Sequence, residues 1–149
     1  MNETVLLVED ESTDADLIAR ALGKVARNAK VIRLSDGDQA VSYLRGDPPY
    51  DERAAYPLPS VVLLDIKLPR RSGFEVIAWV RKQEQPLNRT LIVMLTSSRL
   101  KTDVNRAYEL GANSYLMKPD NSQRLAELAV QFKEYWFRWN EMPDYRIEA

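Results

Sequence analysis

The sequence predicts an α/β fold in which helices cover both faces of one five-stranded parallel sheet. Short apolar runs alternate about five times with longer stretches in which apolar residues recur at helical spacing. Some of these short runs are apolar at every position, as in strands buried on both faces. Consecutive parallel strands joined by right-handed crossovers place their helices on either side of the sheet.

Five strands are expected where the short apolar runs occur. They are predicted at residues 5–8, 30–34, 61–64, 91–95 and 114–117. The first and third contain only valine and leucine, which suits strands that lie inside the sheet. Polar or charged residues follow most of these runs, which marks where each strand ends.

Five helices are expected between and after these strands. Their apolar faces are predicted to consist of Leu17, Ile18, Ala21, Leu22 and Val25; Ala40, Val41 and Leu44; Phe74, Val76, Ile77 and Val80; Val104, Ala107 and Tyr108; and Leu125, Leu128, Ala129, Phe132 and Trp136. Ser12 or Thr13 suits the N-cap of the first helix, and Gly111 suits the end of the fourth. The last helix is expected over about 122–142, stopping before Pro143.

One segment, residues 45–59, interrupts this alternation before the third strand. It is rich in proline and charge and is long for a connection within an α/β unit. Such loops are often functional or mobile, and a tolerated surface insertion explains it equally well. We expect the whole chain, 1–149, to form a single domain, because too few residues follow the fifth strand and helix for an output domain.

The composition argues against several classes of function. The chain contains no cysteine and no histidine, so thiol chemistry, histidine-dependent catalysis and histidine–zinc sites are excluded. Any phosphohistidine must therefore belong to a partner. The net charge of -1 argues against nucleic-acid binding. No apolar run is long enough to cross a bilayer and the N-terminus lacks the features of a secretory signal, so we expect a cytoplasmic protein without membrane contact.

Acidic and polar residues follow the predicted strands at their carboxyl ends. Glu9 and Asp10 follow the first strand, Asp65 the third, Thr96 the fourth and Lys118 the fifth. The carboxyl ends of parallel strands gather at one edge of a sheet, where ligands bind. Carboxylates without nitrogen or sulfur donors favour Mg²⁺. Asp65 is the candidate nucleophile for an aspartyl phosphate, whose oxygens the lysine and a hydroxyl would neutralise.

Each of these residues also has an ordinary structural explanation when it is considered alone. Glu9 and Asp10 suit a solvated helix start, and Asp65 suits a loop acid or a cap. Thr96 and its neighbours could cap the next helix, and Lys118 could be an exposed loop lysine. The hypothesis depends on all of them lying at one edge of the sheet.

In these motifs the sequence closely resembles the receiver domains of two-component response regulators. The matching pieces are VLLVED at 5–10, LLDIKLP at 63–69, SG at 72–73, MLTS at 94–97, GA at 111–112 and YLMKP at 115–119. The resemblance extends to about residue 135, and the pieces are specific as an ordered set. It implies a flavodoxin-like, doubly wound sheet with the strand order 2-1-3-4-5.

The resemblance also implies a role for each matching residue of the acidic site. Asp65 would be the phosphoacceptor, and Asp10 would bind Mg²⁺ directly. Glu9 would bind Mg²⁺ directly or through water, and the backbone carbonyl of Lys67 would be a further ligand. This chain has a Glu-Asp pair where two aspartates are usual, a change that bears on metal affinity and leaves the site intact.

The same resemblance implies a conformational switch. Thr96 would bind the phosphoryl group through its hydroxyl, Lys118 would pair with that group, and Tyr115 would change rotamer as Thr96 moves. Half-buried core packing is the ordinary explanation for Tyr115. The family also implies a cis bond between Lys118 and Pro119. Ser98, like Lys67, occupies a position that tunes phosphoryl lifetime.

The implied function is that of a response regulator in a phosphorelay, which accepts a phosphoryl group from a partner histidine kinase. The domain would not be an enzyme beyond its own phosphoryl transfer and dephosphorylation. The insertion and the aromatic run 132–143 resemble small stand-alone regulators of bacterial and cyanobacterial phytochrome kinases. Trp136, Phe137 and Trp139 cannot all face one core, so we expect an exposed aromatic at a homodimer or kinase contact, together with the face of helix 4, strand 5 and helix 5.

Three other functions compete with this one. A phosphohydrolase of the haloacid-dehalogenase type needs a second aspartate two positions after the nucleophile, where this chain has Lys67. A nucleotide-binding flavodoxin-like domain needs a glycine-rich phosphate loop, and none with the expected spacing occurs among only 5 glycines. A receiver-like interaction module that works without phosphorylation is disfavoured by the complete set of site residues.

Overall fold

The chain forms a five-stranded parallel sheet with helices on both faces. The computed structural model describes residues 3–144. The strands are β1 (Glu3–Val8), β2 (Ala29–Leu34), β3 (Val61–Leu64), β4 (Ile92–Thr96) and β5 (Ser114–Met117). They lie in the order β2-β1-β3-β4-β5, and every neighbouring pair is parallel. This arrangement confirms the predicted doubly wound topology.

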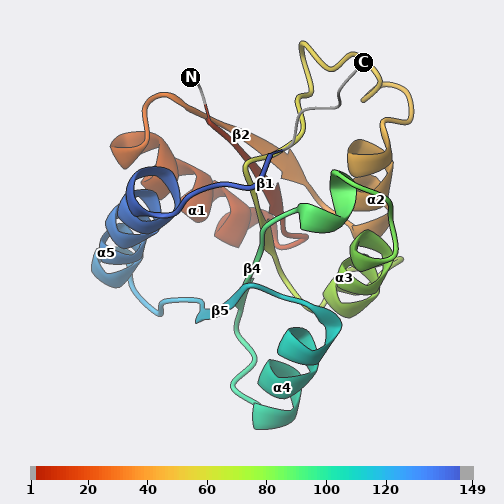
Figure 1. Cartoon of the computed structure of the whole chain (residues 1–149). Coiled ribbons are helices and arrows are strands. Elements are labelled where there is room, and N and C mark those ends of the chain that lie inside the picture. Colours follow the sequence, from red (N-terminus) through yellow and green to blue (C-terminus); the bar gives the residue numbers. More distant parts are fainter. Residues whose placement is uncertain (1–2, 145–149) are drawn as a thin grey trace.

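The helices divide between the two faces of the sheet (Figure 1). One face carries α1 (Ser12–Val25) and α5 (Ser122–Lys133), and the other carries α2 (Gly37–Arg45), α3 (Gly73–Arg81) and α4 (Lys101–Leu110). A short 3-10 helix, η1 (Leu87–Arg89), precedes β4, and a π-helical turn, η2 (Glu134–Trp139), extends α5. None of the helices within residues 3–144 combines the length and the apolar character of a bilayer-spanning segment.

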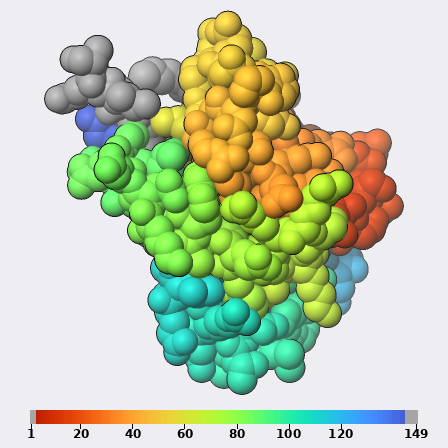
Figure 2. All heavy atoms as spheres, turned by 90° about the vertical axis from the view of Figure 1, so that its right-hand side faces the viewer, coloured from red at the N-terminus to blue at the C-terminus, as the bar shows by residue number. Residues whose placement is uncertain are grey.

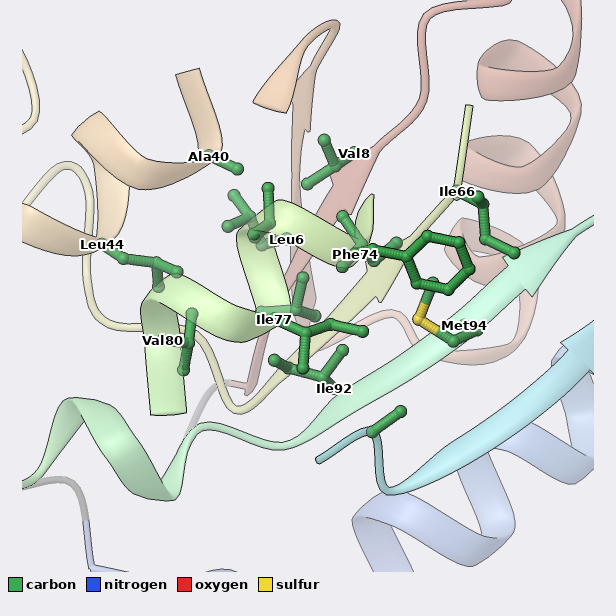
Figure 3. Close-up of a cluster of buried hydrophobic side chains, with 14 of the residues drawn as sticks. Leu6, Val8, Ala40, Leu44, Ile66, Phe74, Ile77, Val80, Ile92 and Met94 are labelled. Atoms are coloured by element: carbon green, nitrogen blue, oxygen red, sulfur yellow. The ribbon is translucent and has the colours of Figure 1, made fainter. Parts of the chain in front are cut away.

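The side chains of β1 point alternately into two separate hydrophobic cores. Leu6 and Val8 belong to the cluster beneath α2, α3 and α4, whereas Val5 and Leu7 belong to the cluster beneath α1 and α5. Figure 3 shows the first cluster, in which Phe74 of α3 lies among side chains from the strands. Successive side chains of a strand point to opposite faces, so an apolar run is buried on both sides.

The first helix begins one residue earlier than predicted. Glu11 is the N-cap, and its side chain accepts a hydrogen bond from the Thr13 N–H at 2.9 Å. The expected caps Ser12 and Thr13 lie instead within the first turn. Leu17, predicted on the apolar face, is exposed, as is Tyr108 on α4. In α1 the buried face is narrower than predicted and consists of Ala15, Ile18 and Leu22, which recur every three or four residues.

The C-terminal ends of α4 and of the last helical run differ in how well they match the sequence prediction. Gly111 ends α4 in the left-handed conformation with φ 111°, as predicted. The last helical run ends at Trp139, short of the expected position near 142. Asn140 has an extended backbone, and its N–H donates to the Tyr135 carbonyl at 2.7 Å, which closes the final turn. Trp139 is 70% exposed, so the prediction of an exposed aromatic there is confirmed.

The segment before β3 is folded around aromatic side chains. The rings of Tyr50 and Tyr56 pack edge-on at 5.3 Å, and both lie against Tyr43 of α2. Arg53 donates from Nη1 to the Tyr43 carbonyl at 2.8 Å and from Nη2 to the Leu44 carbonyl at 2.9 Å. The last carbonyls of a helix lack partners within it, so this guanidinium caps α2 and anchors the loop.

This segment lies at the amino edge of the sheet. The Ser60 N–H donates to the Thr4 carbonyl at 2.8 Å, and Lys30 Nζ donates to the Ala55 carbonyl at 2.5 Å. Figure 2 shows residues near 50 as a raised mass beyond α2. The insertion is therefore at the end of the sheet opposite to the carboxyl ends of the strands.

Candidate functional site

Three carboxylates meet at the carboxyl edge of the sheet. Glu9 and Asp10 follow β1, and Asp65 follows β3. The two strands are neighbours with Val8 opposite Leu64, so the acids leave the sheet side by side. Oxygen atoms of these three carboxylates lie within 4.8 Å of one another. Glu9 and Asp65 are buried and Asp10 is exposed, so one side of the cluster is open to solvent.

Lys118 brings a positive charge into this cluster from β5. Its Nζ lies 3.2 Å from Asp65 Oδ2 and also forms an ion pair with Glu9. A third carboxylate, Asp14 in the first turn of α1, places Oδ2 3.0 Å from the same nitrogen. The Lys118 side chain is only 12% exposed. The ammonium is therefore enclosed by acids rather than solvated, and it is not the exposed loop lysine that the sequence also allowed.

The charges of the cluster act strongly on one another. Burial raises the pKa of Glu9, and the nearby Asp65 carboxylate raises it further. Burial alone would lower the pKa of Lys118, but hydrogen bonds to Glu9 and Asp14 outweigh it and the pKa is raised. Lys118 is consequently a stable cation at neutral pH. Its single positive charge faces several carboxylates, so the cluster retains an excess of negative charge.

The backbone around Asp65 is held by the start of α3. The Gly73 N–H donates to the Ile66 carbonyl at 2.8 Å, and a Cβ at Gly73 would lie 2.2 Å from the Asp65 carbonyl oxygen. Only glycine permits this approach. The Ile66 N–H donates to Asp65 Oδ1 at 2.8 Å, while Oδ2 faces the ammonium. Lys67, two residues beyond Asp65, lies in the connection to α3 with an exposed side chain.

Thr96 and Tyr115 both form hydrogen bonds with the backbone of Ser98, two residues beyond the end of β4. Thr96 is the buried last residue of β4, and its carbonyl accepts from the Lys118 N–H at 2.9 Å. The Ser98 N–H donates to Thr96 Oγ1 at 3.4 Å, and the Tyr115 hydroxyl donates to the Ser98 carbonyl at 2.9 Å. Tyr115 is half-buried and packs against the core beneath α3 and α4. The expected half-buried packing of Tyr115 is confirmed.

One expectation for this edge is wrong. Within residues 3–144 the cis peptide bonds precede Pro49 and Pro86, and the bond between Lys118 and Pro119 is trans. The trans isomer is the lower-energy state of most bonds that precede proline.

The donor set suits a hard divalent cation. Glu9, Asp10 and Asp65 offer carboxylate oxygens, and the chain has no histidine or cysteine to favour a softer metal. The excess of negative charge and the open side at Asp10 fit an ion that keeps several of its waters. Sequence reasoning missed Asp14, although its place in the first turn after the acidic pair is a signal that was available. It also missed the close approach of Gly73.

Comparison with known proteins agrees with this geometry. The model of the response regulator receiver domain matches residues 5–130. The response regulator Rcp1 of Synechocystis is 33% identical over 141 residues, which cover 95% of this chain and 93% of that protein. The probable methanogenesis regulatory protein FilR2 of Methanothrix harundinacea is 38% identical over 139 residues, covering 93% and 86%.

Solved structures extend the similarity to the whole fold. The phosphorylated cyanobacterial phytochrome response regulator RcpA superposes with a TM-score of 0.88 at 30% identity, covering 97% of this chain and 100% of that one. The Mn²⁺-bound form of Rcp1 superposes with a TM-score of 0.84 at 32% identity, covering 95% and 99%. Because the receiver domain model matches residues 5–130 and Rcp1 is 33% identical over 95% of this chain, the chain belongs to the response regulator receiver domain family.

Proposed function

We propose that this domain accepts a phosphoryl group on Asp65 from the phosphohistidine of a partner histidine kinase, with Mg²⁺ at Glu9, Asp10 and Asp65. The observation that carries the proposal is the Asp65 carboxylate beside two further acids and 3.2 Å from a buried ammonium. The Mn²⁺-bound structure of the relative Rcp1 supports the binding of a divalent ion. The Lys67 carbonyl is proposed as a further ligand.

The transfer needs positioning and neutralisation of charge more than covalent help from other groups. An Asp65 carboxylate oxygen forms a bond to phosphorus while the phosphorus–nitrogen bond of the donor breaks, and its electron pair returns to the histidine ring. When bound, Mg²⁺ supplies positive charge to the phosphoryl oxygens. Lys118 and the Thr96 hydroxyl neutralise the remaining oxygens. Hydrolysis of the acyl phosphate later restores the carboxylate, so the domain acts only on its own phosphoryl group.

The switch that we propose passes through Ser98. Thr96 Oγ1 and the Tyr115 hydroxyl both bond to the backbone of Ser98, at 3.4 and 2.9 Å. When the Thr96 hydroxyl turns toward a phosphoryl group, it gives up the Ser98 N–H, and the loop that holds Tyr115 is free to shift. Phosphorylation then changes the population of two states of the face formed by α4, β5 and α5.

The partners that we propose are a histidine kinase, specifically a phytochrome kinase, and a second copy of this chain. The structural similarity to RcpA, a phytochrome response regulator, supports the first. Exposed apolar side chains support the second, because Tyr108 of α4, Val130 of α5 and Trp139 all face solvent. Since a histidine kinase uses ATP, the proposed location is the cytoplasm.

The test is the intact mass of the protein after incubation with acetyl phosphate, with and without Mg²⁺. The wild-type chain should gain the mass of one phosphoryl group only with Mg²⁺, and Asp65→Asn should gain none. Asp51→Asn, an equivalent change at an exposed position of the insertion, should be labelled like the wild type. Labelling that survives in Asp65→Asn would place the acceptor elsewhere. Absence of labelling in a wild-type protein that binds Mg²⁺ would favour an interaction module that works without phosphorylation.

A further inference from the structure

Lys118 has one carboxylate partner that lies outside the metal-type cluster. Its Nζ contacts Glu9, Asp65 and Asp14, and the distance to Asp14 Oδ2 is 3.0 Å. Glu9 and Asp65 belong to the group whose oxygens converge within 4.8 Å, whereas Asp14 does not. Asp14 comes from a different element, the first turn of α1. The ammonium therefore bridges the acidic cluster and the start of that helix.

Binding of a divalent cation would affect Glu9 and Asp65 differently from Asp14. A cation at the cluster needs oxygens of Glu9 and Asp65, which are the same residues that now hold Lys118. Two positive charges a few ångströms apart also repel each other, more strongly in a poorly solvated site than in water. Asp14 is the contact that Lys118 can keep while the other two carboxylates turn to the cation.

The local structure supports Asp14 in this role. Glu11 caps the helix, and the Ala15 N–H donates to the Glu11 carbonyl at 3.0 Å, so the first turn that carries Asp14 is well defined. A carboxylate in the first turn is also stabilised by the helix dipole. The Asp14 side chain is 40% exposed, but the lysine it holds is only 12% exposed. This pair therefore differs from an ordinary surface ion pair.

We propose that Asp14 is a positioning residue, which anchors the Lys118 ammonium beside the acidic cluster so that Glu9 and Asp65 are released to Mg²⁺ and the ammonium stays within reach of the phosphoryl group. The proposal rests on the proposed function and deepens it. Without Asp14, Lys118 would bind Glu9 and Asp65 more closely and compete more strongly with the metal. The direct consequence is weaker binding of Mg²⁺ to the unphosphorylated protein.

Asp16 offers a matched control on the same helix. It lies two residues away, and its Oδ1 pairs with Arg33 Nη1 at 2.6 Å at a site where both side chains are about half exposed (43% and 52%). Asp16→Asn removes the same charge from the same helix without touching Lys118. A loss of Mg²⁺ affinity that comes only from the net charge of the helix should appear in both Asp14→Asn and Asp16→Asn.

The experiment measures Mg²⁺ affinity by calorimetry on the full chain, with thermal unfolding as a check of folding. Asp14→Asn should bind Mg²⁺ roughly threefold to tenfold more weakly, which is in the lower part of the range of couplings between contacting groups. Asp16→Asn should bind like the wild type, and Asp14→Glu should recover part of the loss. In a Lys118→Met background, Asp14→Asn should have little further effect, because Asp14 acts through the ammonium.

Two outcomes would overturn the inference alone. One is an unchanged Mg²⁺ affinity in Asp14→Asn. The other is that Asp14→Asn weakens Mg²⁺ binding as much in the Lys118→Met background as in the wild type, which would show that Asp14 acts by its own charge. A wild-type chain that binds no Mg²⁺ would overturn the proposed metal site itself and the inference with it. The two failures are thus distinguishable in one series of titrations.

Discussion

Lys118 Nζ lies 3.2 Å from Asp65 Oδ2, although the two residues are 53 positions apart in the chain. They follow β5 and β3, and β4 lies between these strands in the sheet. The lysine therefore spans a neighbouring strand end to reach the acid, which only a long side chain can do. The contact joins the last strand of the fold to the candidate phosphoacceptor, and it makes the stability of this edge depend on one ammonium.

Removal of that ammonium should destabilise the metal-free protein. We expect Lys118→Met to lower the free energy of unfolding by about 2–4 kcal/mol without divalent cations, because buried carboxylates lose their counter-charge. Mg²⁺ should recover more stability in the variant than in the wild type. Urea unfolding with and without Mg²⁺ measures both effects. Arg33→Met, which breaks the exposed pair with Asp16, should change stability by less than about 1 kcal/mol. Equal stability of Lys118→Met and wild type without metal would contradict the prediction.

Because α3 approaches Asp65 closely, we expect a single methyl group added at Gly73 to lower both stability and the rate of labelling. A Cβ at Gly73 would lie 2.2 Å from the Asp65 carbonyl oxygen, so Gly73→Ala must displace the end of β3. We expect a loss of about 1–3 kcal/mol and slower labelling by acetyl phosphate. Gly23→Ala is the control, because a Cβ there meets nothing within 4 Å. It should stabilise α1 by about 0.5–1 kcal/mol. A neutral Gly73→Ala would mean that the β3–α3 connection is more adaptable than this packing implies.

The insertion should contribute to stability without taking part in phosphorylation. Arg53 donates to the carbonyls of Tyr43, Leu44 and Tyr56, contacts that a lysine cannot reproduce. We expect Arg53→Lys to speed hydrogen exchange over residues 47–59 and to lower stability by about 1–3 kcal/mol. Because the insertion lies at the opposite edge of the sheet, the rate of labelling by acetyl phosphate should not change. A slower rate in this variant would instead connect the insertion to the site.

Tyr43 should give the domain an alkaline limit. Burial raises the pKa of Tyr43 to about 12, against a reference value of 10, and its hydroxyl donates to the Pro57 carbonyl at 2.7 Å. Since the unfolded chain releases this proton first, the contribution to stability is complete below pH 10 and is lost as the pH rises through 12.

The slope of that loss is at most about 1.4 kcal/mol per pH unit for one proton. Alkaline unfolding curves of the wild type and Tyr43→Phe should therefore converge as the pH rises, because the variant lacks this group. The near-ultraviolet absorbance of tyrosinate provides a second measurement, in which Tyr43 and Tyr115 titrate late among the 7 tyrosines, and Tyr43→Phe should remove part of the late signal. If all of them titrate together near the reference pKa, Tyr43 is not shielded as described.

Much of the fold follows from local patterns in the sequence. The apolar runs of β1 and β3 predict strands buried on both faces, since each residue of such a run must meet a core on its own side. Gly111 predicts the end of α4, because a left-handed residue there disfavours any side chain with a Cβ. The order of the strands and the set Glu9, Asp10, Asp65 and Lys118 followed from the resemblance and from the rule that parallel strands end at one edge.

Contacts between distant elements were decided only by the tertiary structure. The sequence shows that Asp14 lies close after the acidic pair, but it does not show that Asp14 pairs with Lys118, because this contact joins the start of α1 to the end of β5. The fold of the insertion around Tyr43 depends in the same way on where α2 presents its last carbonyls to Arg53. Local spacing determines which face of an element is apolar, whereas the partner of a charged group depends on which chain ends the packed sheet brings together.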